Sequence, residues 1–189
     1  REFLLSSRTD SLTVVRGDTV LAEWRVDGFA QNDVHLIFSV TKSVTSLLIG
    51  SLVKECGLRP DAPVVTYVPD VAKSAFGDAT VRNLLDMTPW DAPRLHEFIA
   101  TREKEGQHGT RFRYLSPATD LLGWICESVS GMPYHEALAK FVWQPMGAEH
   151  EANITLDRAG SPRAAGGLSV VPRDMARIGM LIRDGGYGA

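Results

Sequence analysis

A serine and a lysine three residues apart are the strongest chemical signal in this sequence. Ser39 and Lys42 open an apolar stretch that predicts a helix from about Ser39 to Cys56, which Gly57 closes. Side chains at this spacing share one helix face, with Cβ atoms roughly 5–6 Å apart. A serine hydroxyl is a weak nucleophile until a base takes its proton. A lysine whose neutral form is favoured by burial or by the positive end of a helix dipole can be that base.

Both residues also have an ordinary structural interpretation, in which Ser39 caps the helix and Lys42 is a solvated first-turn residue. Two features argue against it. A lysine in the first turn has the wrong sign for the helix dipole, and a capping box would place Glu or Gln at that position. The helix is apolar around most of its circumference, which predicts burial, and a buried lysine is costly without a partner or a role.

A second polar group, Tyr114-Leu115-Ser116, directly precedes a predicted helix with Pro117 in its first turn. A tyrosine hydroxyl at such a junction could relay protons between Ser39 and a leaving group. Ser116 could equally be a helix N-cap, and Tyr114 could be a core aromatic residue. The motif by itself leaves these alternatives open.

The elements that would position these groups are segregated along the chain. An N-terminal β-hairpin precedes a long helical stretch, after which a short strand pair and a last helix follow, so the pattern predicts the α+β class. We expect one incomplete domain over residues 1–189, divided into a sheet hairpin (1–38), a mainly helical region (39–160) and a return towards the sheet (161–189). The individual predictions are strands at Ser11–Val15, Thr19–Val26, Asn153–Leu156 and Gly167–Val171, and helices at Thr80–Met87, Leu95–Glu105, Ser116 to just before Gly131, Tyr134–Val142 and Arg173–Arg183.

Composition narrows the class of substrate. Hydrophobic residues make up 44% and charged residues 23% of 189 residues, which is typical of a globular chain. The net charge is -3 and the basic residues do not cluster, so we expect no nucleic-acid partner and a small or neutral substrate. No apolar run approaches the roughly 18 residues of a membrane span. Cys56 and Cys126 lie in apolar helical patterns and are expected to be buried free thiols.

Several segments together resemble one family. Phe38–Ser43 resembles the Ser-x-x-Lys motif of the serine β-lactamases and penicillin-binding proteins, and Tyr114-Leu115-Ser116 resembles the Tyr-x-Asn motif of the class C branch. Further segments resemble the family in the same order. The resemblance implies a β-lactamase-like fold, with an antiparallel sheet flanked by helices and C-terminal strands missing here. It also implies Ser39, Lys42 and Tyr114 as catalytic residues and no metal or organic cofactor. The further segments are 80–88, 109–114, 165–168 and 172–177.

The chain departs from the family pattern in three places, and the first of these shifts the expected substrate. Ser116 stands where β-lactamases have Asn, as in the esterase and amidase members such as 6-aminohexanoate-oligomer hydrolases. This variant implies hydrolysis of a linear amide or carboxylic ester, with Ser116 supporting the tyrosine–lysine network or contacting substrate. Met87-Thr88 runs straight into Pro89-Trp90-Asp91, so either the loop over the pocket is short or residues are missing here, and Trp90 could line the pocket or be structural. No Lys-Thr-Gly motif, which supplies an oxyanion donor in the family, is found, so we expect the chain to be incomplete.

Other functions remain open from the sequence alone. A D-alanyl-D-alanine peptidase or a β-lactamase would use the same chemistry, and a non-catalytic acyl-binding sensor could use the same fold. The chain has no Gly-x-Ser-x-Gly elbow, no His-Glu-x-x-His zinc motif and no phosphate-binding glycine loop. A cytoplasmic location is slightly favoured, and because the chain begins with Arg1 and not with Met, a periplasmic or secreted location stays open. The sequence does not determine the oligomeric state.

Overall fold

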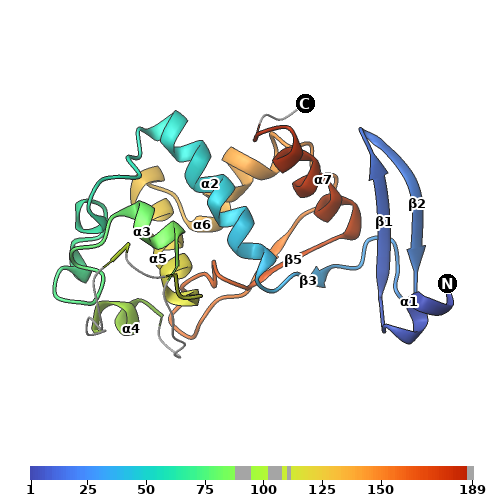
Figure 1. The fold of residues 1–189 in the computed structure, drawn as a ribbon, viewed down its shortest axis with the longest axis horizontal. Coiled ribbons are helices and arrows are strands. Elements are labelled where there is room, and N and C mark those ends of the chain that lie inside the picture. The colour runs from blue at the N-terminus through green and yellow to red at the C-terminus, as the bar shows by residue number, and fades with distance from the viewer. Residues whose placement is uncertain (88–94, 102–107, 110–111, 187–189) are drawn as a thin grey trace.

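The computed structural model describes residues 1–87, 95–101, 108–109 and 112–186. As the segregated pattern predicts, it is an α+β structure with a helical region at one end and a β-hairpin at the other (Figure 1). The helices are α1 (Glu2–Ser6), α2 (Val40–Cys56), α3 (Val81–Leu85), α4 (Leu95–Thr101), α5 (Ser116–Ser130), α6 (Tyr134–Leu138) and α7 (Pro172–Arg183), and the strands are β1 (Ser11–Arg16), β2 (Thr19–Arg25), β3 (His35–Leu36), β4 (Asn153–Ile154) and β5 (Leu168–Val170).

Helices α2 and α5 pack against each other at the centre of the helical region (Figure 1). Their apolar faces form much of one continuous core, which Tyr134 of α6 also joins. Both helices end at a glycine in the left-handed conformation, Gly57 with φ 70° and Gly131 with φ 67°. Glycine adopts this conformation without the steric penalty of a Cβ atom, so the two glycines fix where the helices end.

A small three-stranded sheet joins the segment before α2 to the segment after the loop at 164–167. Its central strand β5 pairs antiparallel with β3 on one side and with β4 on the other. Strand β3 leads directly into α2, and β5 follows the loop at 164–167. Because β3 and β5 are hydrogen-bonded, the start of α2 and this loop are held next to each other. The pairing of β4 with β5 confirms the predicted strand pair, whereas the two-residue β3 was not predicted.

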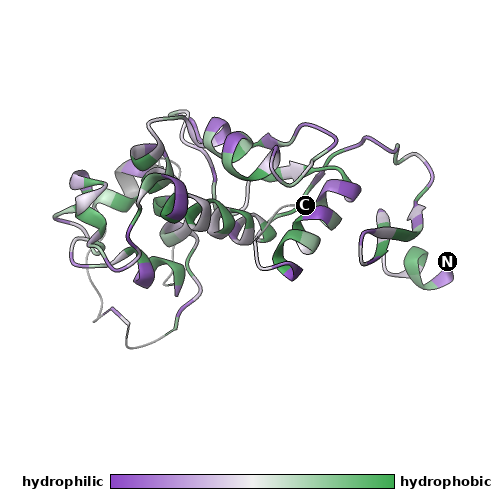
Figure 2. Ribbon diagram, turned by 90° about the horizontal axis from the view of Figure 1, so that it is seen from above, coloured by the Kyte–Doolittle hydropathy of each residue, from purple (hydrophilic) through white to green (hydrophobic). Residues whose placement is uncertain are grey.

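The N-terminal hairpin of β1 and β2 is confirmed, and it stands apart from the helical region in both views (Figures 1 and 2). Helix α7 contacts it: Arg173 donates two 2.8 Å hydrogen bonds to Glu23 of β2. Arg183 donates to the Gly17 carbonyl oxygen at 2.7 Å, in the hairpin turn. These charge-assisted contacts tie the hairpin to the last helix.

Two predictions of local structure need correction. Cys126 is buried but Cys56 is exposed, so only one of the two free thiols belongs to the core. Cys56 is the last residue of α2, where the helix leaves the core. The helix predicted at Tyr134–Val142 continues from α6 as a π-helical segment, Ala139–Trp143. Within the described residues, no helix has both the length and the apolarity needed to cross a membrane.

Candidate active site

Ser39 occupies the turn between β3 and α2. Phe38, immediately before it, adopts φ 45°, a left-handed conformation that is uncommon for a residue with a side chain and recurs at functional sites. Ser39 takes the N-cap position of α2, yet within the described structure its hydroxyl makes no capping hydrogen bond to the helix. Ser39 is exposed and lines a pocket. The capping interpretation of Ser39 is therefore wrong.

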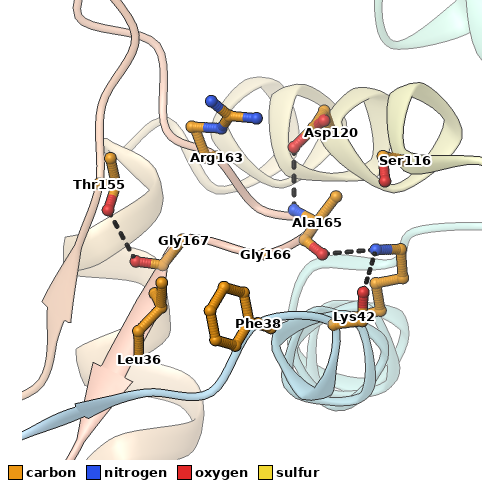
Figure 3. Close-up of a pocket in the computed structure, with 11 residues that line it drawn as sticks. Leu36, Phe38, Lys42, Ser116, Asp120, Thr155, Arg163, Ala165, Gly166 and Gly167 are labelled. Atoms are coloured by element: carbon orange, nitrogen blue, oxygen red, sulfur yellow. Dashed lines mark hydrogen bonds between the residues drawn. The ribbon is translucent and has the colours of Figure 1, made fainter. Parts of the chain in front are cut away.

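Lys42 lies on the first turn of α2 and is only 5% exposed, so it is not a solvated surface residue. Its Nζ donates hydrogen bonds to Ser39 Oγ at 3.1 Å and to the Ala165 carbonyl oxygen at 2.5 Å (Figure 3). The 3.1 Å separation allows direct proton transfer between the two side chains.

Tyr114 approaches the same pair from the loop before α5. Lys42 Nζ lies 4.9 Å from the centre of its ring, within the range of a cation–π contact. A hydrogen bond to Ser39 lowers the pKa of the Tyr114 hydroxyl. Partial burial opposes this effect, while a hydrogen bond to Lys42 and the positive charge of Lys42 add to it. The backbone N–H of Arg113 donates to the Met87 carbonyl oxygen at 2.9 Å, which anchors this loop. Tyr114 is thus an exposed hydroxyl coupled to both members of the pair.

A pocket of about 330 Å³ surrounds the pair, and Ser39, Lys42 and Ser116 all line it. The volume lies in the lower part of the range for small-molecule sites. Ser116 is the first residue of α5, with Leu115 at the N-cap, so it does not cap this helix; its side chain faces the pocket (Figure 3). Trp90, the remaining predicted site residue, lies outside the described residues.

The pocket also contains groups that the sequence motifs did not identify. Asp120 lies one turn after Ser116 on the same helix, and its carboxylate accepts the Ala165 N–H at 2.8 Å (Figure 3). Its position, an acidic residue four after Ser116 in an otherwise apolar helix segment, was the one available sequence signal. Thr155 and Arg163 complete this side of the wall. Thr155 and Arg163 reach the pocket because β4 and β5 pair in the small sheet, of which the sequence predicted β4 and β5 but not β3.

The glycines of the loop allow it to pass close to other backbone. A Cβ atom on Gly167 would lie 2.9 Å from the Arg163 carbonyl oxygen and 3.2 Å from Thr155 Cβ. These distances are shorter than normal van der Waals contacts, so a side chain at this position would displace the loop. The loop conformation that presents the Ala165 carbonyl to Lys42 therefore depends on glycine at position 167.

No metal-binding cluster is evident: the described part of the chain contains no group of three or more His, Cys, Asp or Glu side chains that could hold a metal ion. The polar side chains that line the pocket carry hydroxyl groups, an amine, a carboxylate and a guanidinium, and the phenol of Tyr114 contacts the amine. These groups suit nucleophilic attack and proton transfer.

An exposed serine with a buried lysine one helical turn away, on this α+β scaffold, is the arrangement expected of a penicillin-recognising serine hydrolase. The chain belongs to the beta-lactamase family, whose model matches residues 8–188. It is 36% identical to the 6-aminohexanoate-dimer hydrolase of Paenarthrobacter ureafaciens, over 94% of this chain and 53% of that protein. The chain therefore spans about half the length of this curated relative.

Solved structures confirm the fold. A provisionally named 6-aminohexanoate-dimer hydrolase from Bacillus anthracis matches 98% of this chain and 57% of its own, with a TM-score of 0.90 and 23% identity. The octameric penicillin-binding protein homologue from Pyrococcus abyssi matches all of this chain and 56% of its own, with a TM-score of 0.77 and 25% identity. The expected β-lactamase-like fold is thus shown, over slightly more than half of each of these structures.

Proposed function

We propose that this chain carries the nucleophilic half of a serine hydrolase that cleaves a linear amide or a carboxylic ester through an acyl-enzyme. The observation that supports this most directly is the 3.1 Å contact between Lys42 Nζ and Ser39 Oγ at the wall of an open pocket. A serine next to a buried amine can lose its proton as it attacks, which is what acyl transfer requires.

In the proposed acylation step, the Lys42 amine takes the proton from Ser39 Oγ, and Oγ forms a bond to the substrate carbonyl carbon. The backbone N–H of Ser39, at the start of α2, supplies one donor for the developing oxyanion. The carbon–nitrogen or carbon–oxygen bond of the substrate then breaks as Tyr114 gives its proton to the departing amine or alcohol, and Tyr114 takes up the proton that Lys42 received from Ser39. In deacylation a water molecule gives a proton to Lys42 and attacks the carbonyl carbon of the acyl-enzyme. The bond to Ser39 Oγ then breaks, Oγ takes the proton back from Lys42, and the carboxylic acid leaves.

The identity of the substrate rests on Ser116 and on the named relative. The protein from Paenarthrobacter ureafaciens is a hydrolase of the 6-aminohexanoate dimer, an amide, and it shares 36% identity with this chain. Ser116 offers a hydroxyl at the pocket wall, where an asparagine would offer both an amide donor and a carbonyl acceptor. We infer that short linear amides and esters are preferred over β-lactams.

The decisive experiment compares Ser39→Ala with Ser43→Ala, an exposed serine on the same helix. Ser39→Ala should abolish both p-nitrophenyl ester hydrolysis and labelling by a serine-reactive phosphonate, while Ser43→Ala should retain both. Ester hydrolysis that survives in Ser39→Ala would overturn the assignment of the nucleophile.

A substrate panel then separates the alternatives. Linear amide, p-nitrophenyl ester and penicillin are compared by kcat/KM, and a preference for penicillin would favour a β-lactamase or peptidase instead. Mass spectrometry of the same mixtures detects a third outcome. A stable acyl adduct without turnover would indicate an acyl-binding sensor.

A further inference from the structure

The Asp120 side chain is a buried carboxylate next to the proposed catalytic pair. It is 6% exposed, lies on α5, and is the one acidic side chain among the described residues that line the pocket. A buried carboxylate is costly unless it is hydrogen-bonded or paired. Its hydrogen bond to the Ala165 N–H, at 2.8 Å, therefore binds the loop firmly to α5.

The peptide group between Ala164 and Ala165 is held from both sides. The Ala164 carbonyl oxygen accepts a 2.7 Å hydrogen bond from Thr45 Oγ1 on α2, and the Ala165 N–H donates to Asp120 on α5. Because the peptide unit is planar and rigid, two opposed hydrogen bonds fix its orientation. The loop is thus clamped between the two central helices at this point.

The next carbonyl along the chain is the one that receives Lys42. The Ala165 carbonyl oxygen lies 2.5 Å from Lys42 Nζ, only the φ and ψ torsions of Ala165 away from the clamped peptide (Figure 3). If the peptide group between Ala164 and Ala165 rotated, the Ala165 carbonyl that follows it would move away from α2. Lys42 would then lose the acceptor that directs its amine towards Ser39.

We propose that Asp120 is a positioning residue, which holds Ala165 so that its carbonyl oxygen directs Lys42 onto Ser39. This inference rests on the proposed roles of Ser39 and Lys42 and adds a residue to that machinery. Asp120 acts through geometry, so a neutral side chain that keeps an oxygen acceptor should replace it in part. A role confined to fold stability would change the melting temperature alone, and a role in substrate binding would change KM and not kcat.

The test measures kcat and KM for a p-nitrophenyl ester, together with melting temperature, in Asp120→Leu and Asp120→Asn. Leucine has a comparable length and no acceptor, so it removes the hydrogen bond without leaving a large cavity. We expect kcat of Asp120→Leu to fall about a hundredfold with little change in KM, as for a misplacement of about 1 Å. Asp120→Asn, which keeps an oxygen for the Ala165 N–H, should recover most of this loss, to within about tenfold of the unmodified protein.

The matched control is Asp174→Asn. Asp174 is likewise buried and accepts hydrogen bonds from the backbone N–H groups of Glu149 and His150 and from the Arg177 side chain, but it does not line the pocket. Its substitution should lower the melting temperature and leave kcat of the folded protein unchanged. A loss of kcat in Asp120→Leu beyond that of Asp174→Asn thus reports on the site and not on general stability.

Three outcomes would overturn the inference while Ser39→Ala remains inactive. The first is kcat of Asp120→Leu within about threefold of the unmodified protein. The second is an equal loss in Asp120→Asn and Asp120→Leu, which would make the charge and not the hydrogen bond the essential property. The third is a rise in KM at constant kcat, which would indicate a substrate contact. Activity in Ser39→Ala would instead refute the proposed function itself.

Discussion

Lys42 and Ala165 are 123 positions apart in the chain, yet the side-chain nitrogen of one lies 2.5 Å from the carbonyl oxygen of the other. The same nitrogen lies 3.1 Å from Ser39 Oγ. The lysine is therefore fixed between a backbone acceptor and the proposed nucleophile. A base held in this way needs little reorganisation before proton transfer.

Replacing Lys42 with methionine should remove activity and preserve the fold. Methionine keeps the unbranched side chain but has no nitrogen to accept the Ser39 proton, so kcat for an ester should fall by about 10²- to 10⁴-fold, the usual contribution of a general base. Steady-state kinetics and a melting curve measure the two effects. The control is Lys54→Met on the same helix, whose lysine side chain is 78% exposed. Equal losses in the two variants would refute the role of Lys42 as base.

The ionisation of Tyr114 should report on its contact with Ser39. The hydrogen bond to Ser39 is the largest influence on the pKa of this tyrosine and lowers it. Lys42 also lowers this pKa, by less, and partial burial raises it. Ser39→Ala should therefore raise the pKa of Tyr114 towards its ordinary value of 10.0. Absorbance titration of tyrosinate, with the Tyr114→Phe titration subtracted, isolates this group. An unchanged or lower value in Ser39→Ala would show that the two hydroxyl groups are not coupled.

Gly123 of α5 should be essential for the placement of the 164–167 loop. A Cβ atom there would lie 2.6 Å from Ala164 Cβ, so Gly123→Ala must push Ala164 and its neighbour Ala165 away from the helix. We expect the free energy of unfolding to fall by about 1–3 kcal/mol, as in other overpacked cores. Ester hydrolysis should fall with it, because Lys42 loses its carbonyl acceptor.

The control for this change is Gly179→Ala in α7, where a Cβ atom meets nothing within 4 Å. Alanine is a better helix former than glycine, so this variant should be more stable by about 0.5–1 kcal/mol. Urea denaturation measures both variants. Stabilisation by Gly123→Ala would contradict the close packing of α5 against the loop.

Most regular elements of the fold could be predicted because their signals are local. The ends of α2 and α5 follow from apolar periodicity and from Gly57 and Gly131. The helix predicted from Thr80 is α3, and Thr80 caps it with a capping box to Asn83. Strand β3 could not be predicted, because it has two residues and exists only through its pairing with β5. Such a strand has no periodicity of its own.

The same distinction applies to the site. Ser39 and Lys42 are one helical turn apart, so helix geometry alone predicted their contact. Asp120 and Ala165 belong to the site through tertiary packing, and Ala165 contributes backbone atoms, which carry no signature of residue type. Sequence motifs therefore predicted the proposed reacting groups and missed the groups that we propose to orient the lysine.

The free energy of unfolding should depend on pH through His35, the first residue of β3, whose side chain contacts Asp10 just before β1. One ring nitrogen lies 3.0 Å from the Leu36 carbonyl oxygen and the other lies 2.7 Å from Asp10 Oδ2. With an acceptor at each nitrogen, the doubly protonated ring is favoured. The Leu36 carbonyl, and then Asp10, accordingly raise the pKa of His35 above its ordinary value of 6.5, against a smaller opposing effect of burial.

A raised folded-state pKa sets the sign of this effect. The stabilisation is fully present below the ordinary value of 6.5 and is lost as the pH rises through the raised value of the folded protein. The free energy of unfolding in urea should therefore decline as the pH rises above 6.5, and His35→Gln should remove this component of the decline. Asp10→Asn should reduce it only in part, since the Leu36 carbonyl remains. His135→Gln, at an exposed position of α6, is the control, and an equal change in that variant would assign the pH dependence to other groups.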